Sequence, residues 1–258
     1  MDRTSQKKPL VSVIMPAYNA GVFIEEAIRS VMAQTVADWE LLVLDDGSSD
    51  DTQIIAQRLA REDCRIRLMP NERNMGVART RNRGLDLCRG EYVAFLDSDD
   101  IWYPQKLETQ LAAMKETGAD LSYCSYAIVD AAGEKCRGDY LVPSTVEFND
   151  LLRQNVIGCS TVMLSAAAAE KYRFETDFYH EDYVLWLRLL RDGCRTVGCT
   201  QVLVAWRYVE NSRSFNKWNA AQKRWRIYRE FLHLGFGYSV RLLTEYAFFG
   251  VRKYFKKV

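Results

Sequence analysis

The chain of 258 residues is 48% hydrophobic, which is enough to bury one sizeable core, and its composition is that of an ordinary globular protein. Its net charge of +1 is unevenly distributed: residues 1–210 hold 24 lysines and arginines against 32 aspartates and glutamates, whereas residues 211–258 hold 11 against 2. The acidic first part argues against a nucleic-acid groove, and the basic second part favours an anionic surface as partner.

The cysteines and the N-terminal residues bear on the compartment. The seven cysteines form no C-x-x-C pair, and no histidine lies near Cys194 and Cys199, so free thiols in a reducing compartment are expected rather than a zinc site. The apolar stretch at 10–15 is too short for a signal peptide, and no run approaches the ~18 apolar residues of a membrane span. We expect a cytoplasmic protein, with a peripheral position on the cytoplasmic face of the inner membrane left open.

Strands alternate with helices over the first hundred residues. Short apolar, β-branched runs predict strands at 11–15, 39–44, 65–69 and 92–96. Apolar residues at helical spacing predict helices at 24–32, 52–61 and 78–88. This alternation predicts an α/β fold with a mostly parallel sheet flanked by helices.

The pattern is less regular after residue 100. The predicted elements are a helix at 104–115, a strand at 121–129, a turn at 130–133 that allows a hairpin, a helix at 148–155, a strand at 160–164, a helix at 183–190 and one or two strands within 197–208. Trp186 is expected in the core, because it shares a helical face with leucines.

The last part of the chain combines aromatic and aliphatic residues with lysine and arginine. Trp218, Trp225 and Leu232 are seven residues apart, which predicts one face of an amphipathic helix, and a second such segment follows Gly237. We therefore divide the chain into residues 1–210 and a basic helical tail, 211–258. This tail either lies in a membrane interface or packs on the first domain as a flap with solvated charges.

Carboxylates gather directly after two of the predicted strands. Residues 97–100, Asp-Ser-Asp-Asp, follow one strand, and Asp45 and Asp46 follow another. Crowded carboxylates at the carboxyl edge of a sheet suit a divalent cation such as Mg²⁺ or Mn²⁺ and a bound ligand. The alternatives are structural: Asp99 or Asp100 as the N-cap of the helix at 104–115, and an Asx turn at 45–46.

An ordered set of motifs carries a family resemblance. The motifs are VSVIMPAYN at 11–19, DDGSSD at 45–50, NMGVARTRNRG at 74–84, GEY at 90–92, FLDSDD at 95–100 and HEDYVLWL at 180–187. Together they resemble the family 2 glycosyltransferases, which are inverting nucleotide-sugar enzymes of the GT-A fold, over residues 10 to about 215. Neither a G-x-G-x-x-G fingerprint nor a Walker lysine loop is present.

The resemblance implies roles for individual residues. The donor-binding residues would be Pro16, Ala17 and Tyr18 against the nucleobase, Asp46 as acceptor from a uracil-type base, Arg81 near the donor, Asp97 at the ribose, and Ser98. Asp99 would ligate the metal on the diphosphate, and Asp182 would be the general base, with Glu181 as the fallback. For Arg81, packing between helix and sheet with an exposed guanidinium is the alternative. His180 is left as a neighbour of the base or an ordinary polar residue.

The chain departs from the family pattern at one place. Many relatives carry a histidine after the last core strand that helps to hold the metal or the diphosphate, and Val209 stands about where it would fall. Metal ligation would then rest on Asp99, phosphate oxygens and water. Arg207, Arg213 or Lys217 could clamp the diphosphate instead, and metal dependence could be weak.

The expected activity is inverting transfer of a sugar from a nucleotide-sugar, favoured to be a UDP-sugar, to a glycan or polyprenyl-linked acceptor in surface-polysaccharide synthesis. One carboxylate deprotonates the acceptor and the metal neutralises the departing diphosphate. A nucleotidyltransferase is the second enzyme class considered, although residues 18–21 lack the basic residue of its glycine-rich loop. The remaining alternative is a non-catalytic nucleotide-sugar-binding or scaffold protein at the membrane.

Overall fold

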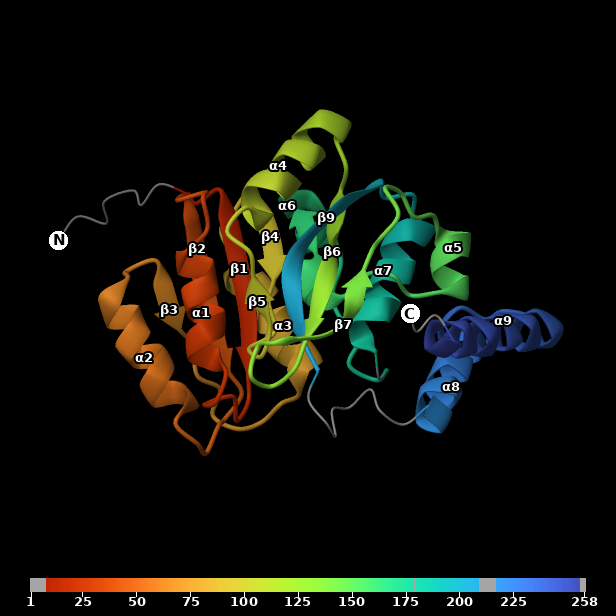
Figure 1. The fold of residues 1–258 in the computed structure, drawn as a ribbon, viewed down its shortest axis with the longest axis horizontal. Helices are drawn as coiled ribbons and strands as arrows, with labels where there is room; N and C mark the ends of the chain where they lie inside the picture. Colours follow the sequence, from red (N-terminus) through yellow and green to blue (C-terminus); the bar gives the residue numbers. More distant parts are fainter. Residues whose placement is uncertain (1–7, 179, 209–216, 256–258) are drawn as a thin grey trace.

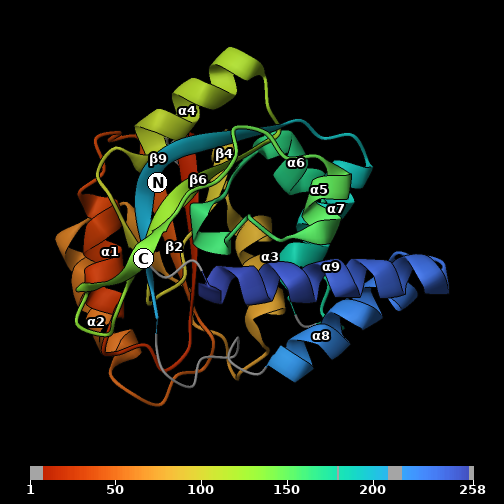
Figure 2. The ribbon, with the colours of Figure 1, turned by 45° about the vertical axis from the view of Figure 1, so that its right-hand side comes forward.

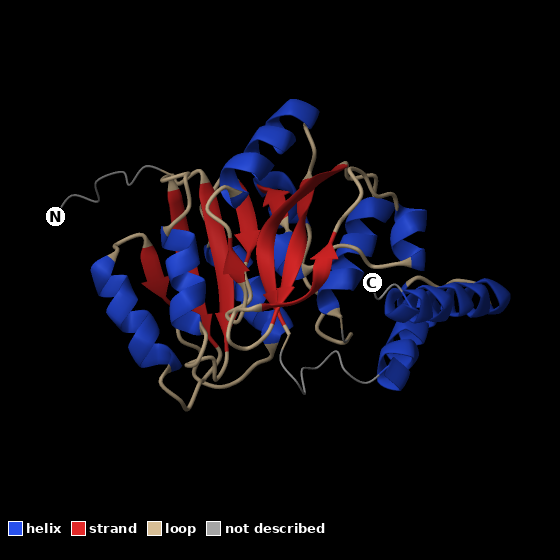
Figure 3. Cartoon of the chain, in the orientation of Figure 1, coloured by secondary structure: helices blue, strands red, loops and turns tan. Residues whose placement is uncertain are grey.

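The computed structural model describes residues 8–178, 180–208 and 217–255, which form a mixed sheet with helices on both faces (Figures 1 and 3). The strands are β1 (Val11–Ala17), β2 (Trp39–Asp45), β3 (Ile66–Leu68), β4 (Tyr92–Phe95), β5 (Ile101–Trp102), β6 (Leu121–Val129), β7 (Lys135–Tyr140), β8 (Met163–Ser165) and β9 (Thr196–Arg207). The helices are α1 (Ile24–Met32), α2 (Thr52–Glu62), α3 (Val77–Leu87), α4 (Lys106–Thr117), α5 (Phe148–Arg153), α6 (Ala166–Lys171), α7 (Glu181–Arg191), α8 (Lys217–Arg226) and α9 (Phe236–Phe255).

The sheet order is β3-β2-β1-β4-β8-β6-β9-β5, with β7 paired to β6. Strands β3, β2, β1 and β4 are parallel, and β6 is parallel to β9, while β8 runs antiparallel between β4 and β6. The predicted mostly parallel α/β sheet is therefore confirmed. Because the parallel strands share one direction, the segments that follow β1, β2 and β4 meet at the same edge.

Two hydrophobic cores explain why β1, β2 and β4 are largely apolar. Along β1, Val11, Val13 and Met15 pack on one face with α1, α2 and α4, whereas Ile14 packs on the other with α3, α6 and α7. Figure 2 separates the two faces, with α1 and α2 on one side and α3 and α6 to α9 on the other. A sheet buried on both faces needs continuous apolar runs rather than alternation, which is why these strands could be predicted.

The later elements differ in detail from the predictions. The predicted strand at 160–164 is instead a 3₁₀ turn (Cys159–Thr161) followed by β8, and the segment 197–208 forms the single long strand β9. The hairpin at 130–133 is present and joins β6 to β7. The short elements β5 and α6 were not predicted.

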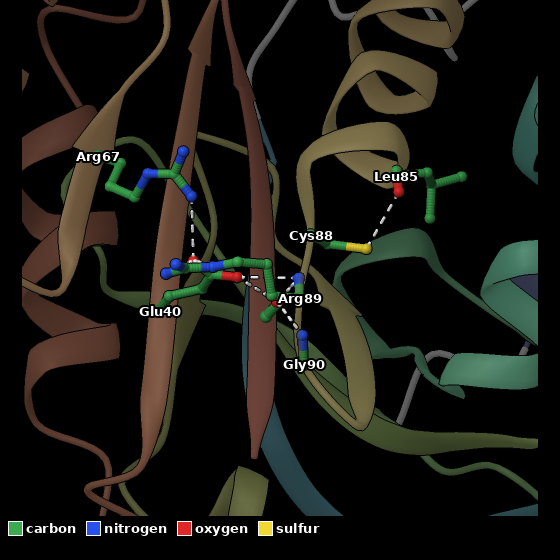
Figure 4. Close-up of polar contacts among 7 residues, drawn as sticks. Glu40, Arg67, Leu85, Cys88, Arg89 and Gly90 are labelled. Atoms are coloured by element: carbon green, nitrogen blue, oxygen red, sulfur yellow. Dashed lines mark hydrogen bonds and ion pairs between the residues drawn. The ribbon is translucent and has the colours of Figure 1, made fainter. Parts of the chain in front are cut away.

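At the amino ends of β1 and β2, a buried carboxylate on β2 ties β1, β3 and the segment after α3 to its own strand (Figure 4). Glu40 accepts hydrogen bonds from the Ser12 hydroxyl at 2.7 Å and from the Arg89 backbone N–H at 3.0 Å, and it pairs with the Arg67 and Arg89 guanidinium groups at 3.2 and 2.8 Å. Burial alone would raise the pKa of Glu40, but the hydrogen bonds from Arg89 and Ser12 lower it overall. This cluster is structural and lies at the sheet edge opposite the carboxylates that follow β2 and β4.

The described part of the tail packs against the preceding residues. After α8, a π-helical turn (Ile227–Phe231) leads to α9, and Ile227, Tyr228 and Leu242 are buried in the same core as α7. The Tyr228 hydroxyl donates to the Leu152 carbonyl at 2.6 Å. None of the helices in the described ranges is long and apolar enough to cross a bilayer. Placing a domain boundary at residue 210 remains a prediction.

Truncating Leu242 tests this packing. We expect Leu242→Ala to lower the free energy of unfolding by about 2–5 kcal/mol, because it removes a side chain that is only 1% exposed from a shared core. Val240→Ala is the matched control: Val240 is 40% exposed and lies two residues before Leu242 on the same helix, so its effect should stay within about 0.5 kcal/mol. Equal effects in urea denaturation would show that the tail does not dock as described.

Candidate active site

A cleft of about 580 Å³ opens at the carboxyl edge of the sheet. All nine residues predicted for the site line it: Pro16, Ala17, Tyr18, Asp46, Arg81, Asp97, Ser98, Asp99 and Asp182. Pro16 and Ala17 end β1 and Tyr18 follows it, Asp46 follows β2, and residues 97–99 follow β4. Arg81 comes from α3, and Asp182 lies in the first turn of α7. The fold thus brings segments separated by more than a hundred residues into one concave surface, and the role of each residue there stays a prediction.

Each of the two interpretations of Asp45 and Asp46 applies to one residue: Asp45, the last residue of β2, forms the turn, and Asp46, which follows it, lines the cleft. Asp45 accepts from the backbone N–H groups of Gly47 and Ser48, both at 3.2 Å, which is the predicted Asx-type turn. Asp46 lines the cleft, and its carboxylate accepts from the Met75 and Gly76 N–H groups, both at 2.9 Å. Asp46 therefore fixes the loop before α3, a structural contact that sequence analysis did not predict.

The N-cap interpretation of the Asp-Ser-Asp-Asp motif is wrong. Helix α4 begins at Lys106, its N-cap position is Gln105, and no side chain caps it. Asp100 is buried instead and accepts from the Ser160 hydroxyl at 2.5 Å and from the Arg207 N–H at 2.9 Å. It anchors the motif to the turn before β8 and to the end of β9.

Arg81 is a buried bridge between two parts of the cleft. Its guanidinium donates to Asp97 at 2.5 Å and to Glu181 at 2.7 Å, and its side chain is 5% exposed. The alternative of an exposed guanidinium is therefore wrong. The bridge connects the carboxylate loop after β4 to the start of α7, which carries Asp182.

Asp99 is the candidate metal ligand. Its carboxylate makes no hydrogen bond or ion pair with another described residue, and burial, followed by the charge of Asp97, raises its pKa to about 6. Within residues 8–178, 180–208 and 217–255, no three histidine, cysteine, aspartate or glutamate side chains gather as a metal site. The donor set fits a cation that takes its remaining ligands from phosphate and water, as Mg²⁺ commonly does.

Asp182 and Glu181 lie side by side in sequence but in different environments. Glu181 is held by Arg81, whereas the one hydrogen bond that a described residue gives the Asp182 carboxylate comes from the Tyr183 N–H, at 2.7 Å. Burial and then the charge of Glu181 raise the pKa of Asp182 to about 7. A carboxylate that is poised near neutral pH and not paired with a cation suits a general base.

His180 precedes these acids in a left-handed backbone conformation, with φ of 67°. Burial and then the charge of Arg224 lower its pKa to about 4, so the imidazole is neutral near pH 7. This left-handed residue is the N-cap residue of α7. His180 lines the cleft together with both acids.

Comparison with known proteins decides the family. The family model "Glycosyl transferase family 2" matches residues 12–169. The chain is a family 2 glycosyltransferase. It is 38% identical over 246 residues to TuaG of Bacillus subtilis (strain 168), named as a candidate teichuronic acid biosynthesis glycosyltransferase, covering 95% of this chain and 98% of TuaG. It is 37% identical over 247 residues to WfgD of Escherichia coli, a UDP-Glc:α-D-GlcNAc-diphosphoundecaprenol β-1,3-glucosyltransferase, covering 95% of each.

Solved structures show the same fold. Staphylococcus aureus TarS residues 1–349, in complex with UDP-GlcNAc, superposes with a TM-score of 0.72 at 20% identity, covering 92% of this glycosyltransferase and 71% of that chain. The mannosyltransferase PcManGT of Pyrobaculum calidifontis, in complex with GDP-Man and Mn²⁺, gives a TM-score of 0.67 at 19% identity, covering 89% and 66%. The GT-A fold expected from the motifs is therefore confirmed, and the nucleotidyltransferase alternative is set aside.

In this glycosyltransferase Arg207 is not the diphosphate clamp that the sequence allowed. The Arg207 guanidinium is fully engaged: it donates to the carbonyls of Asp99, Asp130 and Ala131 and pairs with Glu26 at 2.5 Å. Since its side chain is 1% exposed, Arg207 holds the cleft wall together and is not free to clamp a diphosphate. Val209, Arg213 and the side chain of Lys217 lie outside the described residues.

Aromatic residues are the part of the site that sequence analysis missed. Trp186 is fully buried beside Phe95 and Phe174, so its predicted core position is confirmed. Tyr126 of β6 and Trp206 of β9, in contrast, line the cleft of the glycosyltransferase. No motif marks these two positions, so only the pairing of β6 with β9 reveals that they reach the cleft.

Proposed function

We propose that this glycosyltransferase moves a sugar from a UDP-sugar to a sugar carried on a polyprenyl diphosphate, with inversion at the transferred carbon. The observation that carries the proposal is the meeting of the predicted donor residues and the Asp182 carboxylate in one cleft. The relatives named above support the substrate class, because WfgD is named for UDP-Glc and a diphosphoundecaprenol-linked acceptor.

In this proposal Asp182 takes the proton from the acceptor hydroxyl as that oxygen attacks the anomeric carbon. The bond to the diphosphate oxygen breaks, and the nucleoside diphosphate leaves with the negative charge. Pro16, Ala17 and Tyr18 lie against the base, Asp46 uses the acceptor capacity that its loop contacts leave over, and Asp97 and Ser98 position the ribose. A single base is sufficient because the leaving group needs charge neutralisation rather than a proton from a second carboxyl group.

The direct test is a panel of UDP- and GDP-sugars incubated with GlcNAc-diphosphoundecaprenol, with the products resolved by mass spectrometry. The proposal expects one UDP-sugar to be consumed and the lipid-linked acceptor to gain one sugar. Transfer from GDP-sugars alone would contradict the choice of nucleotide. Binding of every donor without turnover would support the non-catalytic alternative instead.

We further propose that Asp99 holds a divalent cation against the donor diphosphate. The ion would act as a Lewis acid on the leaving diphosphate. Asp99→Asn is expected to remove the gain in UDP affinity that Mn²⁺ gives the unmodified protein, measured by isothermal titration calorimetry. Glu91→Gln, an exposed acid at the other end of β4, is the matched control. A Mn²⁺ effect that survives in Asp99→Asn would place the ion elsewhere.

The start of α9 supports a peripheral contact with an anionic bilayer. Phe236, Tyr238 and Val240 are 67%, 42% and 40% exposed, and the Trp225 ring packs edge-on against Phe236 with centroids 5.5 Å apart. The surrounding tail is strongly basic, with 11 lysines and arginines against 2 acids over residues 211–258. Exposed aromatic side chains within a basic segment are typical of surfaces that dock on anionic lipid.

Vesicle flotation tests this contact. The protein is expected to float with vesicles that contain anionic lipid and to stay behind with purely zwitterionic ones, because basic residues gain from the negative surface. Phe236→Asp should lower the bound fraction about tenfold, since it places a charge where an apolar ring would enter the interface. Ile54→Asp is the control, because Ile54 is 70% exposed on α2. Equal flotation of both variants would contradict the assigned surface.

A further inference from the structure

Four aromatic rings form a continuous row across β7, β6 and β9. Tyr140 and Tyr126 are stacked with centroids 5.0 Å apart and an interplanar angle of 16°. Tyr126 lies 6.3 Å from Trp206, and Trp206 lies 6.4 Å from Tyr208. The row therefore links three strands that pair side by side in the sheet.

These rings lie at the border of the core: Tyr126 and Tyr140 pack against its two hydrophobic clusters, and all four rings keep part of their surface in solvent. All four are half-buried, whereas the neighbouring cluster of Phe95, Phe174 and Trp186 is almost completely buried. Aromatic side chains that keep part of their surface in solvent, at the wall of a cleft, are the usual lining of a ligand site. Two members of the row, Tyr126 and Trp206, therefore present ring surface to the cleft.

The sheet order places this row away from the nucleotide residues. The segments after β1 and β2 carry Tyr18 and Asp46, the carboxylate loop follows β4, and β6 and β9 come only after β8 on the far side. If the nucleotide-sugar donor lies across β1, β2 and β4, the β6–β9 side of the cleft is left for the acceptor. The row also continues beyond the cleft lining to Tyr140 and Tyr208, so it leads from the outside to the reacting centre.

The chemistry of the row suits a sugar. The C–H face of a pyranose packs on an aromatic ring, and its hydroxyls stay at the edge, where they can reach polar groups. Arg137 lies over the Tyr208 ring at 4.4 Å and adds a cation at the outer end of the row. A glycan that enters from solvent and carries an anionic group would meet complementary chemistry along the whole row.

We propose that Trp206 and Tyr126 form the subsite for the acceptor sugar, with Tyr208 extending it outward. This inference rests on the proposed function, because it assigns the acceptor of that same reaction. The platform holds the pyranose ring, and its position in the cleft presents the attacking hydroxyl to the wall that contains Asp182.

The test measures the KM for GlcNAc-diphosphoundecaprenol and, separately, the Kd for UDP. Trp206→Ala should raise the acceptor KM about tenfold, the loss expected when one stacking surface is removed. Trp206→Phe keeps an aromatic face and should raise the KM only about twofold to threefold. In both variants the Kd for UDP should stay within about twofold of its original value.

Two further variants supply a second test of the row and a control. Tyr208→Ala lies outside the cleft lining and should raise the acceptor KM about threefold, even where Trp206→Ala fails to fold. Leu141→Ala, next to β7 and 68% exposed, is the matched control and should leave both constants unchanged. An unchanged acceptor KM in Trp206→Ala and Tyr208→Ala, or a parallel rise in the Kd for UDP, would overturn the inference.

The assay also separates this inference from the proposed function. If the unmodified protein transfers sugar and the variants at Trp206 and Tyr208 have the same acceptor KM, only the assignment of the acceptor subsite is wrong. If the unmodified protein transfers no sugar to any polyprenyl-linked acceptor, the proposed function fails, and the inference that rests on it fails with it.

Discussion

Asp182→Asn should lower kcat for sugar transfer by about a thousandfold, because the amide cannot accept the acceptor proton, and general-base catalysis typically contributes 10²–10⁴. The substitution keeps the side-chain shape, so the hydrogen bond from the Tyr183 N–H can persist. The Kd for UDP should change by less than about twofold, since Asp182 is assigned to the acceptor side. Steady-state kinetics and calorimetry on the same preparation separate the two effects.

The matched control for Asp182→Asn is Asp192→Asn at the other end of α7, where the carboxylate accepts from the Tyr172 hydroxyl. This variant should retain nearly full activity. Glu181→Gln distinguishes the two acids. If Glu181→Gln abolished turnover without loss of stability while Asp182→Asn remained active, Glu181 would be the base and the present assignment would be wrong.

Arg81→Met is expected to lower the free energy of unfolding by about 3–5 kcal/mol, because it leaves Asp97 and Glu181 partly buried without their shared cation. Arg81→Lys should recover part of this loss, since an ammonium group restores the charge but cannot reach both carboxylates as a planar guanidinium does. Denaturation in urea measures both variants.

Arg79→Met serves as the control for Arg81→Met, because Arg79 is exposed on the same helix, and its removal should cost less than about 0.5 kcal/mol. The bridge is ruled out as a stabilising element if Arg81→Met and Arg79→Met unfold at the same urea concentration. A stable Arg81→Met protein that also kept full activity would further show that the bridge does not position α7.

The fold of the first hundred residues could be predicted because β1, β2 and β4 are almost entirely buried and consist mainly of apolar residues. Beyond residue 100 the signals are weaker for physical reasons. Strand β5 has two residues, Ile101 and Trp102, and is defined only by its pairing with β9. Helix α6 did have a signal: Ser165 caps it by accepting from the Ala168 N–H, ahead of an alanine run.

The site could be predicted as a set of residues but not as a network. The motifs identified Arg81 and Glu181, yet they lie 100 residues apart, and only the fold brings their charged groups to 2.7 Å. The burial of Asp100 and the full engagement of Arg207 likewise depend on the pairing of β9 beside β5 and β6. Spacing along the chain contains no information on such contacts, which is why the N-cap and clamp interpretations were wrong.

The central claim is that Asp182 acts as the base in this cleft, and the pH dependence of kcat/KM for the acceptor tests it most directly. Because the pKa of Asp182 is raised to about 7, the carboxylate is protonated and inactive at lower pH. The account predicts that kcat/KM falls about tenfold per pH unit below about pH 7 and levels off above it. A flat profile from pH 5 to 8, or the same profile in the residual activity of Asp182→Asn, would contradict it.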